Sequence, residues 1–139
     1  MASRKTKAFT SFGVAMLFVL AFALYFQSTF KTVVVKGDSM LPNLANGRKV
    51  LVSHAYWLVG PIKRKDIVVI QGDTPDEYII KRVYRMAGEI VDWENIPKNY
   101  SLKNQDFVVP EGTVFVLGDN RPVSEDSRAF GPVELSRVI

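Results

Sequence analysis

An uncharged stretch from residue 8 to residue 30 limits, more than any other feature, what this chain of 139 residues can fold into. Its middle, residues 14–26, is almost wholly apolar, and about 20 apolar residues in helical form span the hydrocarbon core of a bilayer. Basic residues precede the stretch, as they do at the cytoplasmic end of a membrane span. We therefore expect a cytoplasmic basic tail at residues 1–7, a single transmembrane helix at 8–30 and one domain outside the cytoplasm at 31–139.

A cleavable signal peptide is the alternative interpretation of the same stretch, because Ala21-Phe22-Ala23 has the small-x-small pattern of a cleavage site. The apolar run continues past that site through residues 24–26, which is longer than the apolar region of an ordinary signal peptide and favours the anchor. Both interpretations place the chain beyond Lys31 outside the cytoplasm.

Most of the formal net charge of +4 belongs to the N-terminal tail. Arg4, Lys5 and Lys7 carry it, no acidic residue occurs before Lys31, and the rest of the chain is close to neutral. We therefore expect no nucleic-acid-binding surface.

The content of cysteine and histidine limits the possible metal chemistry. The chain has no cysteine, which excludes disulfides and thiolate metal sites, and its one histidine, His54, cannot form a metal site alone. We expect neither a metal nor a cofactor. No other imidazole exists to serve as a catalytic base.

Short β-rich runs alternate with turn signals beyond Lys31, and no segment there has a convincing period of 3.6 residues. This pattern predicts an all-β domain, a compact antiparallel sandwich or barrel. The expected strands are residues 32–35, 49–53, 67–70, 78–84, 89–93, 107–109 and 113–117. Residues 95–106 are polar and predict a loop.

Ser39 is a candidate nucleophile. It follows an extended β-branched run, and Pro42 disfavours helix at Leu41, so we expect Ser39 at a junction between a strand and a turn. Taken alone, Gly-Asp-Ser could be an ordinary turn. A serine hydroxyl needs a neighbouring base to become a strong nucleophile, and in a chain with a single histidine a lysine is the natural candidate.

Lys81 fits the requirements for that base. Alternation along the strand predicted at 78–84 places Lys81 on one face with Ile79 and Val83, among apolar groups that favour a neutral amine. The alternative is a lysine at a sheet edge whose charged end reaches water. The other lysines considered as bases have no comparable apolar setting. We expect these lysines to be surface charges: Lys36, Lys49 and Lys65.

Residues 118–128, Gly-Asp-Asn-Arg-Pro-Val-Ser-Glu-Asp-Ser-Arg, are dense in polar groups and lack the pattern of a strand. Asp126 and Arg128 can form an internal charge pair, and the hydroxyls of Ser124 and Ser127 are suited to orient a nearby amine. A solvated surface turn is the alternative.

The order Ser-Met-x-Pro at 39–42, Lys-Arg at 81–82 and the segment 118–128 resembles the type I signal peptidases, in the form with a single N-terminal anchor that is typical of Gram-positive bacteria. The resemblance implies that Ser39 is the nucleophile, Lys81 the general base and Ser124 the residue that orients the lysine. It also implies a set of residues that brace the active-site loop, which we take as Asp119, Arg121, Asp126 and Arg128.

The function implied by the resemblance is that of a membrane-bound serine endopeptidase without a cofactor. Such an enzyme removes signal peptides from exported preproteins on the outer face of a bacterial cell membrane, and cuts where small residues occupy the first and third positions before the cut. Its expected partners are preprotein signal peptides and the lipid bilayer, and we expect a monomer. The candidate residues for lining the substrate pockets are Val35, Met40, Leu44 and Ile80.

The chain departs from the family pattern after the lysine, where Arg85, Ala87 and Glu89 stand in place of glycine, proline and aspartate. These departures leave open a specialised peptidase of the same family that processes conjugation pilins. A membrane-anchored domain that binds signal sequences without cutting them is a further alternative. Gly37 lacks the hydroxyl that helps to hold the oxyanion in some members, which leaves the backbone N–H of Ser39 as the expected donor.

Overall fold

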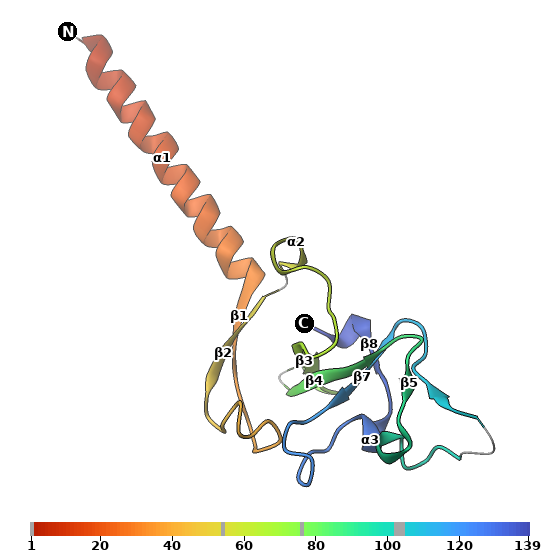
Figure 1. Ribbon diagram of the computed structural model, residues 1–139. Coiled ribbons are helices and arrows are strands. Elements are labelled where there is room, and N and C mark those ends of the chain that lie inside the picture. Colours follow the sequence, from red (N-terminus) through yellow and green to blue (C-terminus); the bar gives the residue numbers. More distant parts are fainter. Residues whose placement is uncertain (1, 54, 76, 102–104) are drawn as a thin grey trace.

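The structure is a computed structural model that describes residues 2–53, 55–75, 77–101 and 105–139. His54 therefore lies outside the described residues, as does a short part, 102–104, of the loop predicted at 95–106. In the part that is described, one long helix stands apart from a domain of short strands (Figure 1).

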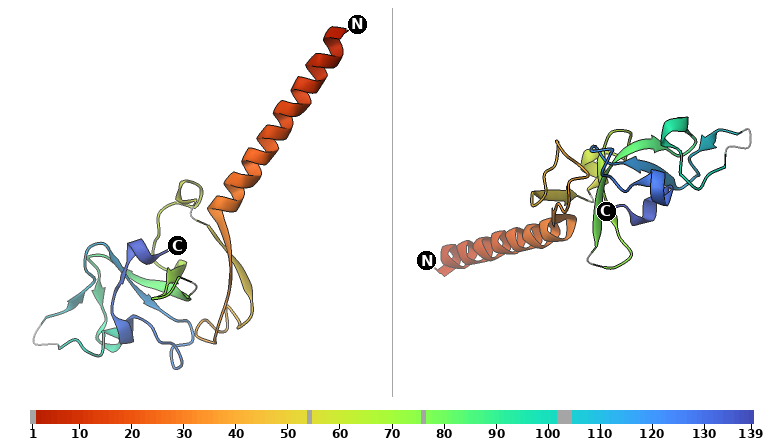
Figure 2. Two further views of the ribbon diagram at one scale, coloured as in Figure 1. Left: turned by 180° about the vertical axis from the view of Figure 1, so that it is seen from behind. Right: turned by 90° about the horizontal axis from the view of Figure 1, so that it is seen from below.

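The long helix α1 (Ala2–Thr29) begins before the predicted span, so the backbone of residues 2–7 in the predicted basic tail is helical as well. Its side chains from residue 11 to residue 28 are exposed, and the part Ser11–Thr29 is long and apolar enough to cross a membrane. Figure 2 shows α1 projecting from the domain in both further views. The helix ends one residue earlier than predicted, because Phe30 already begins the first strand.

The described residues of the domain form eight antiparallel strands in three sheets, which confirms the predicted all-β antiparallel class. One sheet pairs β1 with β2, a second has the order β3-β4-β7-β8, and a third pairs β5 with β6. The bounds are β1 (Phe30–Val34), β2 (Lys49–Ser53), β3 (Ile67–Gln71), β4 (Tyr78–Met86), β5 (Ile90–Val91), β6 (Phe107–Val108), β7 (Thr113–Leu117) and β8 (Val133–Glu134).

The core lies on both faces of the four-stranded sheet. One face carries a cluster centred on β3, β4 and β7, which contains Val68, Ile70, Val83, Val114 and Val116. On the other face, the β1–β2 hairpin packs against Val69 and Ile80, and the β5–β6 hairpin packs against Phe115 and Leu117. Burying each such aliphatic side chain stabilises the fold by roughly 1.5–3 kcal/mol relative to exposure.

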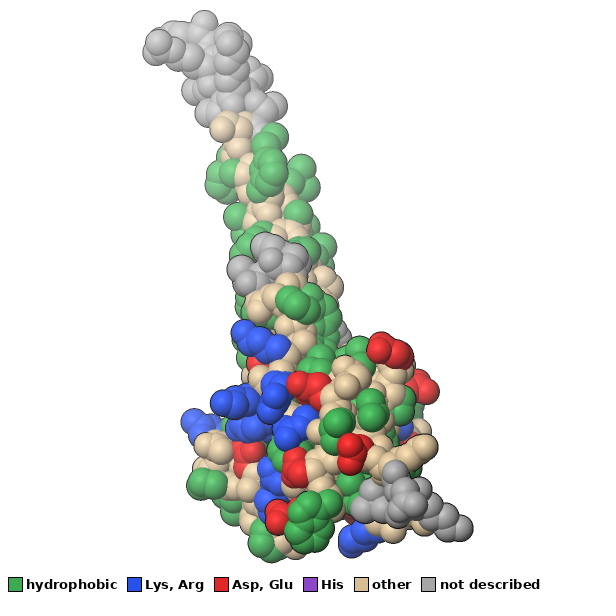
Figure 3. All heavy atoms as spheres, turned by 45° about the vertical axis from the view of Figure 1, so that its right-hand side comes forward, with side chains coloured by type: hydrophobic (Ala, Val, Ile, Leu, Met, Phe, Trp, Pro, Cys, Tyr) green, Lys and Arg blue, Asp and Glu red, His purple; other side chains and the backbone are tan. Residues whose placement is uncertain are grey.

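Among the described residues, three short helical turns lie between strands and a fourth follows β8: α2 (Tyr56–Val59), η1 (Trp93–Asn95), α3 (Ser127–Phe130) and, last, η2 (Leu135–Arg137). The Asp126 carboxylate caps α3 by accepting a hydrogen bond from the Arg128 backbone N–H. On the face seen in Figure 3, hydrophobic side chains cover the described part of α1, whereas charged side chains of both signs gather on the domain.

Candidate active site

Ser39 lies in a turn that follows β1, as the sequence predicts. The Leu41 N–H donates to the Asp38 carbonyl at 3.2 Å, and the next residue after the serine, Met40, is 1% exposed and anchors the turn in the core. Gly37 has a φ of 78°, a left-handed conformation that glycine adopts readily. Glycine therefore suits this position, where a side chain would strain the backbone.

Lys81 occupies the middle of β4, opposite Val68 of β3. Its side chain shares a face with Ile79 and Val83, which pack in the same cluster, and the residue is only 4% exposed. The Lys81 Nζ lies 2.8 Å from the Ser39 Oγ, so the fold brings the two predicted residues into hydrogen-bond contact across 42 positions of sequence.

Burial is the largest influence on the Lys81 amine and lowers its pKa below the ordinary lysine value. The carboxylates of Asp126 and Glu125 act in the opposite direction but do not cancel the effect. A lysine with a lowered pKa can be neutral and can accept the proton of the neighbouring serine hydroxyl.

The polar loop 118–128 is hydrogen-bonded directly to the turn that carries the serine. The Asn120 N–H donates to the Ser39 carbonyl at 2.9 Å, and the Asn120 side-chain amide donates to the Asp38 carbonyl at 3.1 Å. These two bonds fix the backbone on either side of the nucleophile. Sequence reasoning did not single out Asn120.

Asp126 and Arg128 form the predicted pair. Arg128 donates from Nε to Oδ1 at 2.8 Å and from Nη2 to Oδ2 at 3.0 Å, and the Gly118 N–H donates to Oδ2 at 3.0 Å. Full burial would raise the pKa of the Asp126 carboxyl, but the hydrogen bonds from Arg128 and Gly118 outweigh it, so the pKa lies below its ordinary value. The carboxylate therefore stays charged and ties both ends of the loop together.

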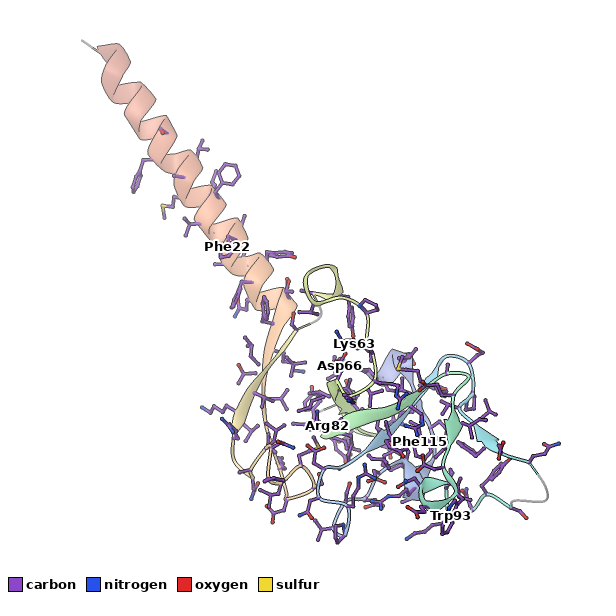
Figure 4. All side chains as sticks on the ribbon, in the orientation of Figure 1. Phe22, Lys63, Asp66, Arg82, Trp93 and Phe115 are labelled. Carbon is purple, nitrogen blue, oxygen red and sulfur yellow. The ribbon has the colours of Figure 1, made fainter. Side chains whose placement is uncertain are left out.

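Asp119 is held by two residues that sequence reasoning did not include in the site. Arg82 donates to it through Nε and Nη2, at 2.8 and 2.7 Å, and the Asn43 amide donates to it at 2.8 Å. Alternation on β4 places Arg82 on the face opposite Lys81, where the pattern suggests only a surface charge; Figure 4 shows it at β4. These hydrogen bonds to Asp119 join the strand that carries Lys81, the polar loop 118–128 and the turn that carries Ser39.

Ser124 occupies a crowded position beside Gly118. Its Oγ is shielded from solvent and completes no hydrogen bond with any residue in the described part of the chain, so the predicted contact with Lys81 is not made in this structure. The hydroxyl is near enough to Asp126 to help lower the pKa of that carboxyl, although the geometry falls short of a hydrogen bond. A methyl group on Gly118 would collide with Ser124 and lie 2.7 Å from the Ser39 carbonyl oxygen.

The remaining predicted site residues are Arg121 and the four candidates for lining the substrate pockets. Arg121 points toward Tyr84, with its guanidinium carbon 5.4 Å from the ring centre. The four candidates for pocket lining pack together in one apolar cluster, and two of them also line a cavity of about 430 Å³ that does not include Ser39. The cluster contains Val35, Met40, Leu44 and Ile80, and the last two line the cavity.

Ser39 and Lys81 instead open into a cleft of about 770 Å³. Its apolar walls come from β3, β4 and the segment around α3 and β8, and they include Ile70, Ile79, Val123, Phe130 and Val133. The sequence carried one usable signal for this cleft, since Ile79 was already expected on the face of Lys81. The role of the four predicted lining residues stays a prediction.

Comparisons of this chain with known proteins agree on one family. The model of the family described as "Signal peptidase, peptidase S26" matches residues 7–97 and 94–139. Signal peptidase I of Bacillus amyloliquefaciens is 32% identical over 98% of this chain and 84% of its own length. Signal peptidase I T of Bacillus subtilis is 30% identical over 99% and 85%, and signal peptidase IB of Staphylococcus aureus is 31% identical over 91% and 82%.

A solved signal peptidase I from Enterococcus faecalis is 30% identical and covers 56% of this chain and 93% of its own, with a TM-score of 0.43. The two structures overlap only in part, so the assignment rests on the sequence matches, which extend over nearly the whole chain. On those matches, the chain belongs to the signal peptidase family, peptidase S26.

Proposed function

We propose that this chain is a membrane-bound serine endopeptidase that removes signal peptides from exported preproteins by means of a Ser39–Lys81 dyad. The observation that carries the proposal is the 2.8 Å contact between the Ser39 hydroxyl and the amine of a lysine that is almost fully buried. A domain that only bound signal sequences would have no need of this pair. Family membership supports signal-peptide removal as the reaction.

The reaction begins with neutral Lys81. Its amine takes the proton of the Ser39 hydroxyl while Oγ attacks the scissile carbonyl carbon, which gives a tetrahedral oxyanion and a lysine ammonium. The ammonium then protonates the leaving amine, the C–N bond breaks, and the signal peptide remains as an ester on Ser39. Lys81, neutral again, takes a proton from water, whose oxygen attacks the ester carbon. The tetrahedral intermediate then collapses, the lysine ammonium returns the proton to the departing Ser39 Oγ, and the acid leaves with the serine and the neutral lysine restored.

The backbone N–H of Ser39 is our candidate for stabilising the oxyanion. Among the described residues it donates to no other group, so it is free to bind a developing negative charge. The hydrogen bond from Asn120 to the Ser39 carbonyl holds the same peptide segment in place. The donor is therefore arranged before the substrate arrives.

The helix α1 supplies the anchor in this proposal, with its N-terminus in the cytoplasm and the domain outside. An enzyme and a substrate confined to one bilayer meet at a raised effective concentration without any further contact. The chain leaves α1 directly into β1, and the Lys31 side chain hydrogen-bonds the Tyr78 hydroxyl at the start of β4. The strand that carries Lys81 is thus tied to the point where the chain leaves the membrane.

Substrates are expected to carry small residues, often alanine, at the first and third positions before the cut. The test is incubation of the purified full chain in detergent with a preprotein that carries Ala-x-Ala before its mature sequence, followed by N-terminal sequencing of the product. We expect one cut after the second alanine with the wild type and none with Ser39→Ala, a change that removes one oxygen atom.

An intact preprotein after incubation with folded wild type would contradict the proposal. Tight binding of the signal sequence without a cut would then favour the binding domain. Cleavage restricted to a pilin precursor would favour the specialised peptidase of the same family.

A further inference from the structure

Next to the strand that carries Lys81, the carboxylate of Asp92 accepts hydrogen bonds from three side chains. The Tyr84 hydroxyl lies 2.6 Å from both carboxylate oxygens, Arg85 Nη2 lies 2.8 Å from Oδ1, and Asn95 Nδ2 lies 2.6 Å from Oδ2. The hydrogen bond from Tyr84 is the main cause that holds the pKa of Asp92 below its ordinary value, while partial burial acts against it. Asp92 is the common acceptor of this group.

A β-bulge in β4 explains how two consecutive residues reach the same carboxylate. The pairing of β4 with β7 shifts between Val83 and Arg85, and such a shift inserts an extra residue, here Tyr84, into one strand. The Arg85 Nε donates to the Ile90 carbonyl at 3.0 Å, and its guanidinium carbon lies 4.2 Å from the centre of the Tyr84 ring. Arg85, a departure from the family pattern, is thereby fixed between β4 and β5.

The group around Asp92 contacts the polar loop 118–128 through Arg121. The Arg121 guanidinium lies over the Tyr84 ring, and its Nη1 donates to Asn95 Oδ1 at 3.2 Å. The backbone carbonyl of Arg121 accepts a hydrogen bond from Arg128 Nη2 at 2.8 Å, in the same loop. The polar loop therefore contacts the group around Asp92 at Arg121, which lies midway between Gly118 and Ser124 in the sequence. In Figure 4, Trp93 marks the neighbouring turn η1, at the end of the domain away from α1.

We propose that Asp92 is a positioning residue for the cleavage reaction proposed above: by fixing Tyr84 and Asn95 it holds Arg121, and with Arg121 the loop that is hydrogen-bonded to the serine turn. The inference rests on the proposed function. Misplacement of catalytic groups by about 1 Å costs on the order of a hundredfold in rate, so loosening this support lowers kcat.

The predicted loss is specific to kcat. Asp92, Tyr84 and Asn95 do not line the cleft that holds Ser39 and Lys81. Substrate binding in that cleft is therefore expected to survive a change at Asp92, which separates a positioning role from a role in binding.

The test compares Asp92→Ala with Asp92→Asn in the full chain in detergent, with kcat, KM and thermal stability measured for each. Asp92→Ala removes the common acceptor, and we expect kcat to fall at least tenfold with KM within twofold of the wild type. Asp92→Asn keeps the shape and one acceptor oxygen, and we expect it to recover most of the lost kcat. A residue that only stabilised the fold would lower the melting temperature without changing kcat of the folded enzyme.

Arg64→Gln is the matched control. It removes the ion pair between Arg64 and Glu89, which joins the segment before β3 to the turn after β4 and lies outside the group around Asp92. We expect wild-type kcat and KM from it. If Asp92→Ala does not fold, Asn95→Ala removes one partner of Arg121, and we expect a loss of about threefold in kcat.

A folded Asp92→Ala enzyme with kcat within twofold of the wild type would overturn the inference, and so would a change confined to KM. If Asp92→Ala does not fold, an unchanged kcat in Asn95→Ala overturns it equally. A wild type that cuts no preprotein refutes the proposed function instead, so the two failures are distinguishable.

Discussion

Lys81 is nearly buried on β4, where burial lowers the pKa of its amine while the carboxylates of Asp126 and Glu125 raise it. Asp126 is fully buried and braces the loop, but Glu125 is exposed and lines the cleft, so its charge can be removed without disturbing the fold. Removing a nearby negative charge makes the ammonium less favourable.

We therefore predict that Glu125→Gln lowers the pKa of Lys81 further. At any given pH more of the amine is then neutral, so the rise of the cleavage rate with pH moves toward acid. The measurement is the pH profile of kcat/KM for wild type, Glu125→Gln and the control Glu111→Gln, an exposed acid that does not line the cleft. An unmoved profile, or one displaced toward alkali, would show that Glu125 does not act on the base.

Gly118 is restricted by space rather than by backbone conformation. A Cβ on Gly118 would collide with the side chain of Ser124, in the polar loop, and with the carbonyl oxygen of Ser39, in the serine turn. We predict that Gly118→Ala destabilises the fold by about 1–3 kcal/mol and lowers kcat strongly, since the loop and the serine turn must move apart.

Denaturant unfolding and kcat measure the two effects of Gly118→Ala separately. Gly13→Ala in α1 is the comparison, because a Cβ on Gly13 would have no heavy atom of the described residues within 4 Å. Equal kcat values for the two variants would be inconsistent with a tight contact at Gly118.

At the scale of elements, the polar loop depends on the pair of Asp126 and Arg128. Arg128→Ala would leave a fully buried carboxylate without its partner, which costs about 3 kcal/mol. Because the folded-state pKa of Asp126 lies below its ordinary value, this stabilisation is complete at neutral pH and is lost as the pH falls through that lowered pKa.

Equilibrium unfolding of wild type and Arg128→Ala at pH 7 and at the lowest pH at which both still fold measures that difference. We expect the gap in unfolding free energy to narrow in acid. A gap that stays constant with pH would mean that the pair contributes through packing alone.

The sequence predicts the elements best where alternation is regular and long. β2 and β7 have the predicted bounds, because each is a run of apolar and β-branched residues closed by turn signals. β8, α2 and α3 were not predicted, since two to four residues carry no measurable period and are held by tertiary contacts. β4 runs two residues further than predicted, to Met86, through the bulge that no periodic pattern reveals.

The same limit applies to the site. Ser39, Lys81 and the pair of Asp126 and Arg128 could be singled out as candidates because each belongs to a recognisable motif or an apolar setting. Arg82 and Asn120 lie within two of these motifs, but the sequence does not reveal their partners. Their hydrogen bonds, like that of Asn43, arise only when three distant segments meet.

In the whole molecule, the exposed apolar helix α1 is the proposed membrane anchor, and the separate domain carries the proposed catalytic residues. The basic residues before the span predict that its N-terminus lies in the cytoplasm. The chain has no cysteine, so a single introduced cysteine reports its own location without background from the protein.

We predict that a membrane-impermeant maleimide added to intact cells labels Ser136→Cys, in the exposed turn η2 of the domain, and does not label Ser3→Cys in the N-terminal tail. Lysed cells provide the control, in which both variants must react. Labelling of Ser3→Cys alone in intact cells would reverse the orientation and place the domain in the cytoplasm.

Single-turnover cleavage of one preprotein by wild type, Ser39→Ala and Lys81→Met measures the proposed roles of Ser39 as the nucleophile and of Lys81 as its base. Methionine suits the buried position of Lys81 and carries no basic amine, so the variant is expected to fold. We expect both variants to stay folded and to lose about a thousandfold or more in rate. Cleavage by either variant at more than a tenth of the wild-type rate would rule out the role proposed for the replaced residue.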